Sequence, residues 1–140
     1  MSHIRIAAEE AFAPPELLDR YRQLLEEATG LDPGFLSLWG HYAGKSSQAT
    51  QLVASIQDVG EGRLRDMDDS GIAKQILSLS APGVQIFDAA TPTGLAVSCN
   101  DQLAEAIRRH PGRFAGLAAI APQDPASAAR NWRGASVDLA

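Results

Sequence analysis

Three short apolar segments, each followed by a segment with helical periodicity, constrain the fold of this chain most strongly. These segments are residues 4–8, 73–80 and 114–121. Apolar strands that alternate with helices are typical of a parallel sheet covered by helices, so we predict an α/β fold. Two architectures fit this order: an open doubly wound sheet or part of a (β/α)8 barrel. The sequence contains neither a GxGxxG motif nor a P-loop, so nothing supports a nucleotide-binding open sheet.

The first two segments are separated by several predicted helices. Pro14 and Pro15 open the first, because proline is tolerated where the amide donors are unpaired anyway. We predict that it ends near Gly30 and that residues 31–50, which are rich in glycine and aromatic side chains, form a long loop. Two further helices are predicted over residues 48–58 and 61–70, the second ended by Gly71.

After the second apolar segment, Thr91 and Pro92 resemble an N-cap followed by a first helical residue. The helix that they open repeats apolar residues every four positions, which places Cys99 in the core. Residues 114–121 are the third predicted strand, and Asp124 is the predicted cap of a last helix.

Composition excludes several classes of protein. The chain has 140 residues, the size of one domain, with a net charge of −5 and a single cysteine. This charge argues against a nucleic-acid or an anionic membrane partner, and no apolar run approaches the ~20 residues of a membrane span. The first residues lack the features of a signal peptide, and one cysteine forms no internal disulfide. We therefore expect a cytoplasmic protein.

Four stretches, taken together and in this order, carry a resemblance to a known family. They are RIAAEEAFA (5–13), SLWGHYAG (37–44), DMDDSGIAKQILSLSAPGVQ (66–85) and NDQLAEAIRRHPGRFAGLAAIAPQDP (100–125). They resemble the amino-terminal half of the metal-dependent aromatic acid decarboxylases of the amidohydrolase superfamily, which include γ-resorcylate, 2,3-dihydroxybenzoate and 5-carboxyvanillate decarboxylases. The family fold is a (β/α)8 barrel, so the resemblance implies that residues 1–140 supply about the first three β/α units of one such domain.

The resemblance gives Glu9 a role as a metal ligand. The sequence pattern alone favours the interpretation of Glu9 and Glu10 as solvated carboxylates in a loop. In the family, the first glutamate of this pair binds a divalent metal at the carboxyl end of the first strand. Mn²⁺ is the expected ion, with Zn²⁺ or Mg²⁺ as alternatives. Some members have a further histidine at the position of Ala11, so this chain lacks one possible ligand.

The resemblance also implies substrate-binding residues, which are Leu38, Tyr42, Gln48 and Ser80. Leu38 and Tyr42 lie in the aromatic segment that covers the substrate in the family, although a hydrophobic loop packed on the barrel explains them equally well. Close relatives have an arginine where this chain has Gln48, which leaves the identity of the substrate open. Ser80 ends the second strand, where a hydroxyl group can also serve only as a cap.

The function implied is the metal-dependent, non-oxidative decarboxylation of a hydroxylated aromatic acid. The substrate would be a small aromatic carboxylate, and the full-length protein would be a homo-oligomer. Two alternatives remain: a metal-dependent hydrolase similar to a lactonase, and a non-catalytic fragment or association module.

The last ten residues depart from the family pattern. Residues 131–140, NWRGASVDLA, do not continue the amphipathic helix that the family has there. We interpret them as an aberrant tail produced by a shift of the reading frame near codon 130. A barrel interrupted after its third unit would leave a parallel strand edge unpaired and apolar faces uncovered.

Overall fold

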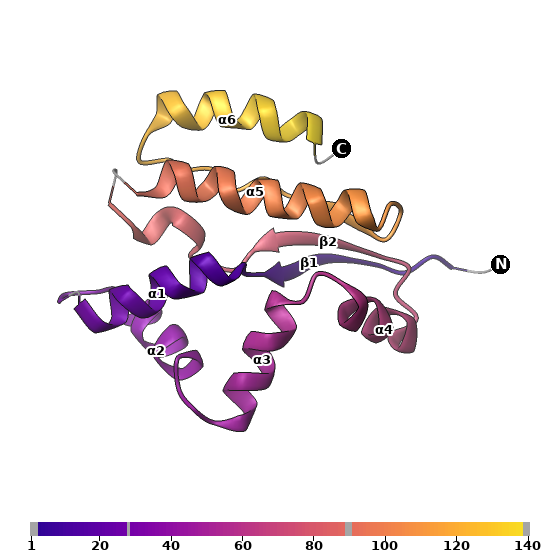
Figure 1. Cartoon of the computed structure of the whole chain (residues 1–140), viewed down its shortest axis with the longest axis horizontal. Helices are drawn as coiled ribbons and strands as arrows, with labels where there is room; N and C mark the ends of the chain where they lie inside the picture. Colours follow the sequence, from indigo (N-terminus) through magenta and orange to yellow (C-terminus); the bar gives the residue numbers. More distant parts are fainter. Residues whose placement is uncertain (1–2, 28, 89–90, 139–140) are drawn as a thin grey trace.

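The computed structural model describes residues 3–27, 29–88 and 91–138, and it describes side chains as far as residue 132. A three-stranded sheet is combined with helices that connect its strands and follow the last of them (Figure 1). In chain order the elements are β1 (Ile6–Phe12), α1 (Pro15–Glu27), α2 (Pro33–Tyr42), α3 (Ser47–Gln57), α4 (Glu61–Ser70), β2 (Lys74–Leu79), the 3₁₀ helix η1 (Gly83–Ile86), α5 (Pro92–Arg109), β3 (Phe114–Gly116) and α6 (Pro125–Asp138).

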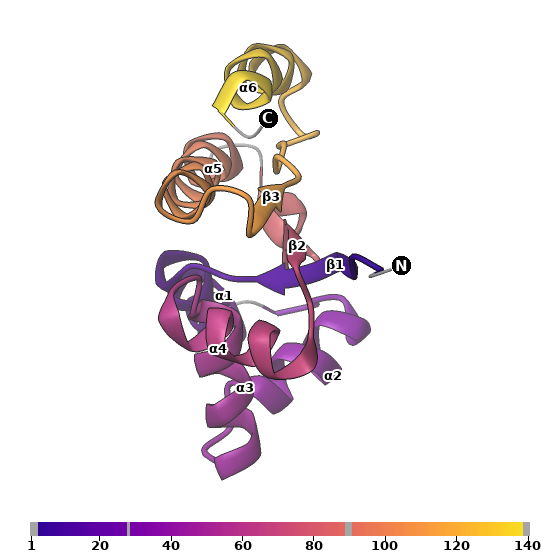
Figure 2. The same ribbon diagram turned by 90° about the vertical axis from the view of Figure 1, so that its right-hand side faces the viewer.

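The sheet is parallel, with the strand order β1-β2-β3. Helices α1, α4 and α5 lie on one side of the strands, whereas the opposite side of β2 and β3 carries no helix in the described part of the chain (Figure 2). We call these two sides the covered face and the open face. Strands and helices alternate as the sequence predicted, so the predicted α/β class is confirmed.

A β-bulge in β1 sets which side chains point to each face. Ala7 is paired with Gln75 and Glu10 with Leu77, so two residues of β1 lie opposite Ile76 alone. Paired residues on parallel strands point to the same side, and both Gln75 and Leu77 are buried on the covered face. The bulge therefore directs Glu10 to the covered face and leaves its neighbour Glu9 on the open face.

Two hydrophobic clusters pack against the covered face and around its carboxyl end. The first is built on aromatic rings: Tyr21 of α1 contacts Phe35 and Trp39 of α2, with ring centroids 5.3 and 4.6 Å apart. The second joins the strands to α4 and α5 through Phe12, Met67, Leu77, Leu103 and Phe114. Cys99 is fully buried in the first cluster, as predicted.

Close packing between β3 and α5 requires a glycine. A Cβ atom on Gly116 would lie 2.6 Å from a methyl carbon of Leu103, which is closer than side-chain carbons approach. Gly71 meets a different need, since it ends α4 in the left-handed region with φ of 68°, as predicted for this position.

The main error of the sequence prediction is the long loop at 31–50. Most of this segment is helical, because Asp32 caps α2 by accepting a hydrogen bond from the Phe35 amide at 2.9 Å, and Pro33 occupies the first turn. The side chain of Ser46 caps α3 in the same way, at 3.1 Å from the Ala49 amide. These caps outweigh the low helix propensity of Gly34 and Gly40, which both lie within α2.

Other boundaries also differ from the predictions. Strand β1 runs to Phe12 because β2 continues to pair with it, so Glu9 lies within the strand rather than at its carboxyl end. Strand β3 stops at Gly116, well short of residue 121. Helix α5 begins at Pro92 as predicted, but the Thr91 side chain makes no capping hydrogen bond. Asp124 does cap α6, accepting from the Ser127 amide at 3.1 Å.

The helix α6 runs through Asp138, past the point where the sequence predicted a break. Residues 131–138 contain no proline, so nothing in them prevents the helical backbone from continuing. The interpretation of residues 131–140 as a frame-shifted tail stays a prediction. Among the helices described, none has both the length and the apolar character to cross a membrane.

Candidate active site

Glu9 is the one predicted metal ligand, and the structure places it on the open face. Its side chain is exposed, and in the described part of the chain it has no hydrogen bond or ion pair. The bulge at this position is what turns it away from the helices. A carboxylate presented in this way is available to bind a cation.

The described residues do not complete a metal site around this carboxylate. No group of three or more histidine, cysteine, aspartate or glutamate side chains is close enough together to hold a metal ion within residues 3–27, 29–88 and 91–132. A single carboxylate suits a hard divalent ion but does not bind it tightly. Glu9 therefore fits as one ligand of a metal whose other ligands these residues do not provide.

Ser80 follows β2 directly and joins the carboxyl ends of two strands. Both its amide and its hydroxyl group donate to the carbonyl oxygen of Phe12, at 2.8 and 3.1 Å. Its own carbonyl oxygen accepts from the Gly83 amide at 2.9 Å. The hydroxyl hydrogen is therefore used within the protein, while the lone pairs of its oxygen remain available to a donor.

Two cavities lie beside the turn that follows Ser80. One, of about 320 Å³, is lined by Leu38 together with Trp39 and Phe35 of α2. The other, of about 300 Å³, is lined by Ser78 and by the chain that follows β3. Both cavities share Ala81, Pro82 and Gln85. Each cavity has the size of a small-molecule site.

Helix α2 is fixed to this turn by a tryptophan. The indole Nε1 of Trp39 donates to the carbonyl oxygen of Ala81 at 2.9 Å, and the peptide bond between Ala81 and Pro82 is cis. Leu38, the residue before this anchor, is 43% exposed and faces the cavity. The structure thus brings the predicted residues Leu38 and Ser80 to the same end of the sheet.

The other two predicted substrate residues lie elsewhere. The ring of Tyr42 packs on Trp39 with centroids 5.5 Å apart and lines a small hollow between helices with Leu18 and Val53. Gln48 is exposed in the first turn of α3, at the end of that helix away from the sheet (Figure 1). The structure does not bring Tyr42 or Gln48 together with Glu9, and their roles in substrate binding stay predictions.

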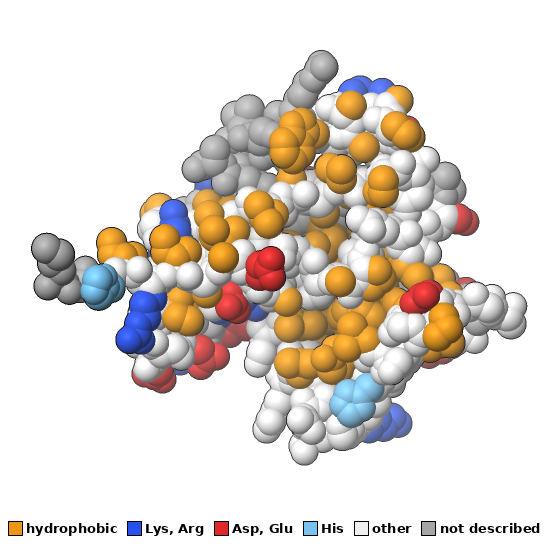
Figure 3. All heavy atoms as spheres, turned by 180° about the vertical axis from the view of Figure 1, so that it is seen from behind, with side chains coloured by type: hydrophobic (Ala, Val, Ile, Leu, Met, Phe, Trp, Pro, Cys, Tyr) orange, Lys and Arg blue, Asp and Glu red, His pale blue; other side chains and the backbone are white. Residues whose placement is uncertain are grey.

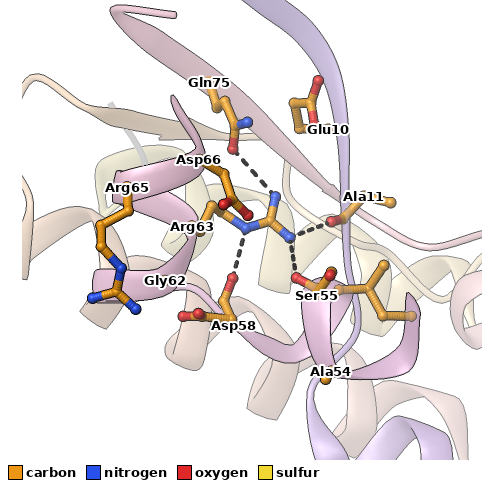
Figure 4. Close-up of a pocket in the computed structure, with 11 residues that line it drawn as sticks. Glu10, Ala11, Ala54, Ser55, Asp58, Gly62, Arg63, Arg65, Asp66 and Gln75 are labelled. Atoms are coloured by element: carbon orange, nitrogen blue, oxygen red, sulfur yellow. Dashed lines mark hydrogen bonds between the residues drawn. The ribbon is translucent and has the colours of Figure 1, made fainter. Parts of the chain in front are cut away.

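A buried arginine, Arg63 of α4, lies beside the bulged strand (Figure 4). Its side chain donates to the carbonyl oxygens of Ala11, Ser55 and Asp58 at 2.8, 3.0 and 2.6 Å, and to Oε1 of Gln75 at 3.2 Å. Removal from water lowers the pKa of this guanidinium, and the carboxylate of Glu10 acts in the opposite direction. A cavity of about 460 Å³ adjoins these groups on the covered side.

Burial also changes the acidity of two core groups near the aromatic cluster. Loss of solvent raises the pKa of the Cys99 thiol to about 12, with a smaller contribution from Glu16. Burial likewise raises the pKa of Tyr21, whose hydroxyl group donates to the Gly83 carbonyl oxygen at 2.7 Å. Neither group is a nucleophile at neutral pH, so both belong to the framework that holds the site.

Sequence reasoning missed Arg63 and Gln85. Arg63 lies four residues before Met67 on the same side of α4, so helical periodicity alone places it on the buried side. Gln85 stands in the stretch SAPGVQ, which the resemblance had already marked. Its place between two cavities depends on how α2 meets this turn, and that contact leaves no signal in the sequence.

Comparison with known proteins places this arrangement in a class. No protein-family model matches the chain. The structure superimposes on a 5-carboxyvanillate decarboxylase from Novosphingobium aromaticivorans, crystallised with manganese and 4-hydroxy-3-methoxy-5-nitrobenzoic acid. The TM-score is 0.91 at 43% sequence identity, over 99% of this chain and 40% of that one.

Two further relatives agree with this comparison. A dihydroxybenzoic acid decarboxylase from Polaromonas sp., with bound manganese and the inhibitor 2-nitroresorcinol, gives a TM-score of 0.75 at 33% identity, covering 99% of this chain and 36% of that one. A γ-resorcylate decarboxylase from Rhodococcus jostii is 36% identical over 136 residues, which are 96% of this chain and 36% of that protein.

The fold is therefore part of an amidohydrolase-type (β/α)8 barrel, as the sequence predicted. Within that class, the chain is a homologue of the metal-dependent aromatic acid decarboxylases, and the resemblance found in the sequence is confirmed. The chain spans 36–40% of the length of these relatives.

Proposed function

We propose that this chain provides one metal ligand and part of the substrate pocket of a metal-dependent decarboxylase that acts on hydroxylated aromatic acids without oxidation. The observation that carries this proposal is the position of Glu9, which the bulge presents on the open face. A closed (β/α)8 barrel encloses this face, and its active site lies at the carboxyl ends of the strands.

Manganese is the metal that we propose, because both decarboxylases described above were crystallised with it. When bound, it would act as a Lewis acid that orients the oxygen atoms of the substrate. The contribution of this chain is the Glu9 carboxylate, an oxygen ligand of the kind that Mn²⁺ prefers. The remaining ligands must come from outside the described residues, so we assign no reaction step to these residues alone.

The substrate pocket that we propose lies around the turn at Ala81 and Pro82. Its apolar wall is formed by Leu38 and Trp39, which suits the face of an aromatic ring. Gln85 lines both cavities with its polar side chain, and Ser80, which directly precedes the turn, has a hydroxyl oxygen that retains lone pairs. Tyr42 and Gln48 complete the proposed set, although they would have to approach the substrate from positions outside these two cavities.

A chimeric enzyme tests this function, since the described residues hold one ligand only. Residues 1–130 of this chain would replace the matching residues of the Novosphingobium 5-carboxyvanillate decarboxylase. We expect manganese-dependent loss of ultraviolet absorbance from at least one hydroxylated aromatic acid in a panel, with release of CO₂. Glu9→Gln should abolish both tight manganese binding and turnover, while Glu26→Gln, on the exposed surface of α1, should change neither.

Other outcomes would contradict the proposal. A folded chimera that binds manganese and decarboxylates no acid of the panel would reject the decarboxylase function. Hydrolysis of lactones by that same chimera would favour the hydrolase alternative. The 140-residue chain alone is expected to be inactive with added Mn²⁺, and activity from it would show that its own residues complete the site.

A further inference from the structure

The bulge in β1 requires something to hold it, because it places adjacent residues on the same face of a strand. Ala8 and Glu9 are both exposed, whereas successive side chains of a regular strand point to opposite faces. A strand that pairs without its extra residue would turn one of them toward the helices. The strand itself contains no proline or glycine that would fix the irregular pairing.

Arg63 binds the sheet on both sides of this bulge (Figure 4). On one side it donates to Gln75, which is the register partner of Ala7 before the bulge. On the other side it donates to the carbonyl oxygen of Ala11, after the bulge. The same guanidinium therefore contacts the paired strand and the bulged strand at the two ends of the irregular segment.

The guanidinium is itself held in place by the helical layer. It donates to Ser55 at the end of α3 and to Asp58 in the connection to α4, and the arginine is only 8% exposed. In the described part of the chain it has no salt bridge; its four partners are three backbone carbonyl oxygens and one amide oxygen. Burying a charge without an ion pair is costly, and such groups are retained in some proteins because they specify one register.

We propose that Arg63 is a positioning residue, which fixes the bulge of β1 and thereby keeps Glu9 on the open face. The effect of Arg63 on metal binding by Glu9 rests on the proposed function, whereas its effect on the bulge does not. Arg63 lies on the covered side and does not share the open face with Glu9, so its effect on a ligand would pass through the backbone of β1. Loss of its four hydrogen bonds would free the strand to adopt regular pairing.

Thiol labelling of the 140-residue chain tests whether Arg63 fixes the bulge, and it requires no metal. The native Cys99 is fully buried and unreactive, so it reports whether the chain stays folded. Ala8→Cys and Glu9→Cys, made separately, should react at similar rates, which is the signature of the bulge. In an Arg63→Met background, we expect the rate at one of these positions to fall by about tenfold relative to the other.

Arg65 supplies the matched control. It lines the same cavity and carries the same charge, but it is exposed and has no hydrogen bond in the described structure. Arg65→Met should leave both labelling rates unchanged. Equal rates at positions 8 and 9 in Arg63→Met, with Cys99 still protected, would overturn the inference.

If Arg63→Met exposes Cys99 and so unfolds the chain, the milder Arg63→Lys variant decides. Lysine keeps the charge but not the planar fork that reaches four acceptors, so the two rates should still separate. Equal rates in a folded Arg63→Lys protein would overturn the inference.

The manganese affinity of the chimera, measured by electron paramagnetic resonance, tests whether Arg63 also affects metal binding by Glu9. Arg63→Met should weaken binding by about 10–100-fold, as other changes that disturb the support of a metal ligand do. If the manganese affinity is unchanged while the labelling rates at positions 8 and 9 differ, Arg63 fixes the bulge but does not affect metal binding by Glu9. Separated rates in a protein whose parent chimera binds no manganese would reject the proposed function and leave the role of Arg63 in the bulge standing.

Discussion

The two faces of the sheet are formed by the same three strands and differ in almost every other respect. On the covered face, Leu77 and Phe114 are 0% and 2% exposed and contact helices α4 and α5. On the other side, Ile6 and Leu117 are 55% and 56% exposed, and the view from behind shows hydrophobic side chains gathered with a few acidic ones (Figure 3). The difference shows that the apolar contacts of the described residues are concentrated on one side of the sheet.

This division also separates the packed part of the described structure from the part that holds the candidate site. On the covered face, helices of this chain bury the apolar side chains of the strands. The open face holds Glu9 and borders one of the two cavities, but the residues that the structure describes do not complete a metal site there. In a closed (β/α)8 barrel, the corresponding face of the strands is enclosed by the other strands of the barrel.

The largest expected difference in stability is between two variants that each truncate one leucine, one on the covered face and one on the open face. Leu77→Ala should lower the free energy of unfolding by about 2–5 kcal/mol, because it opens a hole in a packed cluster. Leu117→Ala should change it by less than about 0.5 kcal/mol, since this side chain is mostly in water already. Urea unfolding followed by circular dichroism measures both. Similar losses from the two variants would mean that the exposed side is packed in solution, for example in an oligomer.

An intermediate effect is expected from alkaline pH, because two core groups lose protons more easily when the chain unfolds. The pKa of Cys99 is about 12 in the folded chain, above its ordinary value of 9.0, and that of Tyr21 is also raised. A raised pKa stabilises the fold below the unfolded value, and this stabilisation is lost as the pH rises through the folded value. The free energy of unfolding should therefore fall above about pH 9 for Cys99 and above about pH 10 for Tyr21, by up to about 1.4 kcal/mol per pH unit for each group.

Urea titrations at pH 8, 9, 10 and 11 measure this slope. Cys99→Ala should make the decline between pH 9 and 10 shallower, whatever it does to stability at pH 8. A Val97→Ala variant, which changes an exposed residue two positions away on α5, serves as the control. An unchanged slope in Cys99→Ala would show that other groups govern the alkaline transition.

The covered face was also the one that the sequence predicted best. The periodicity of α4 and the stop at Gly71 were correct, and Cys99 was placed in the core from its four-residue spacing. These features depend on local patterns, which the sequence displays directly. Helix α2 was missed although Asp32 and Pro33 are a good start signal, because glycines nearby suggested a loop.

The candidate site was predicted less completely, for a physical reason. Glu9 came from family resemblance, and its face depends on a bulge that two strands create together. Arg63 and Gln85 matter through contacts between elements that are distant in the sequence, which no local pattern encodes. Residues that stabilise the fold are thus recognisable from their periodic spacing in the sequence, whereas residues of a site assembled from several elements are not.

The smallest expected difference in stability is between two variants that each remove the hydroxyl group of one tyrosine in the aromatic cluster. Tyr21→Phe should lower the free energy of unfolding by about 1–2 kcal/mol, because the buried Gly83 carbonyl loses the donor that lies 2.7 Å away. Tyr42→Phe should cost less than about 0.5 kcal/mol, since its hydroxyl group has no hydrogen bond in the described structure. Thermal or urea unfolding of the 140-residue chain distinguishes the two.

In the chimera, removing the hydroxyl group of Tyr42 should affect substrate binding more than removing that of Tyr21, if Tyr42 binds substrate. Tyr42→Phe would then raise KM and leave stability unchanged, while Tyr21→Phe would act mainly through the turn at Gly83 that lines the second cavity. A Tyr42→Phe enzyme with unaltered KM and kcat would remove Tyr42 from the proposed pocket. The ring packing on Trp39 would then be its whole role, and Tyr42 would belong with the residues that stabilise the fold.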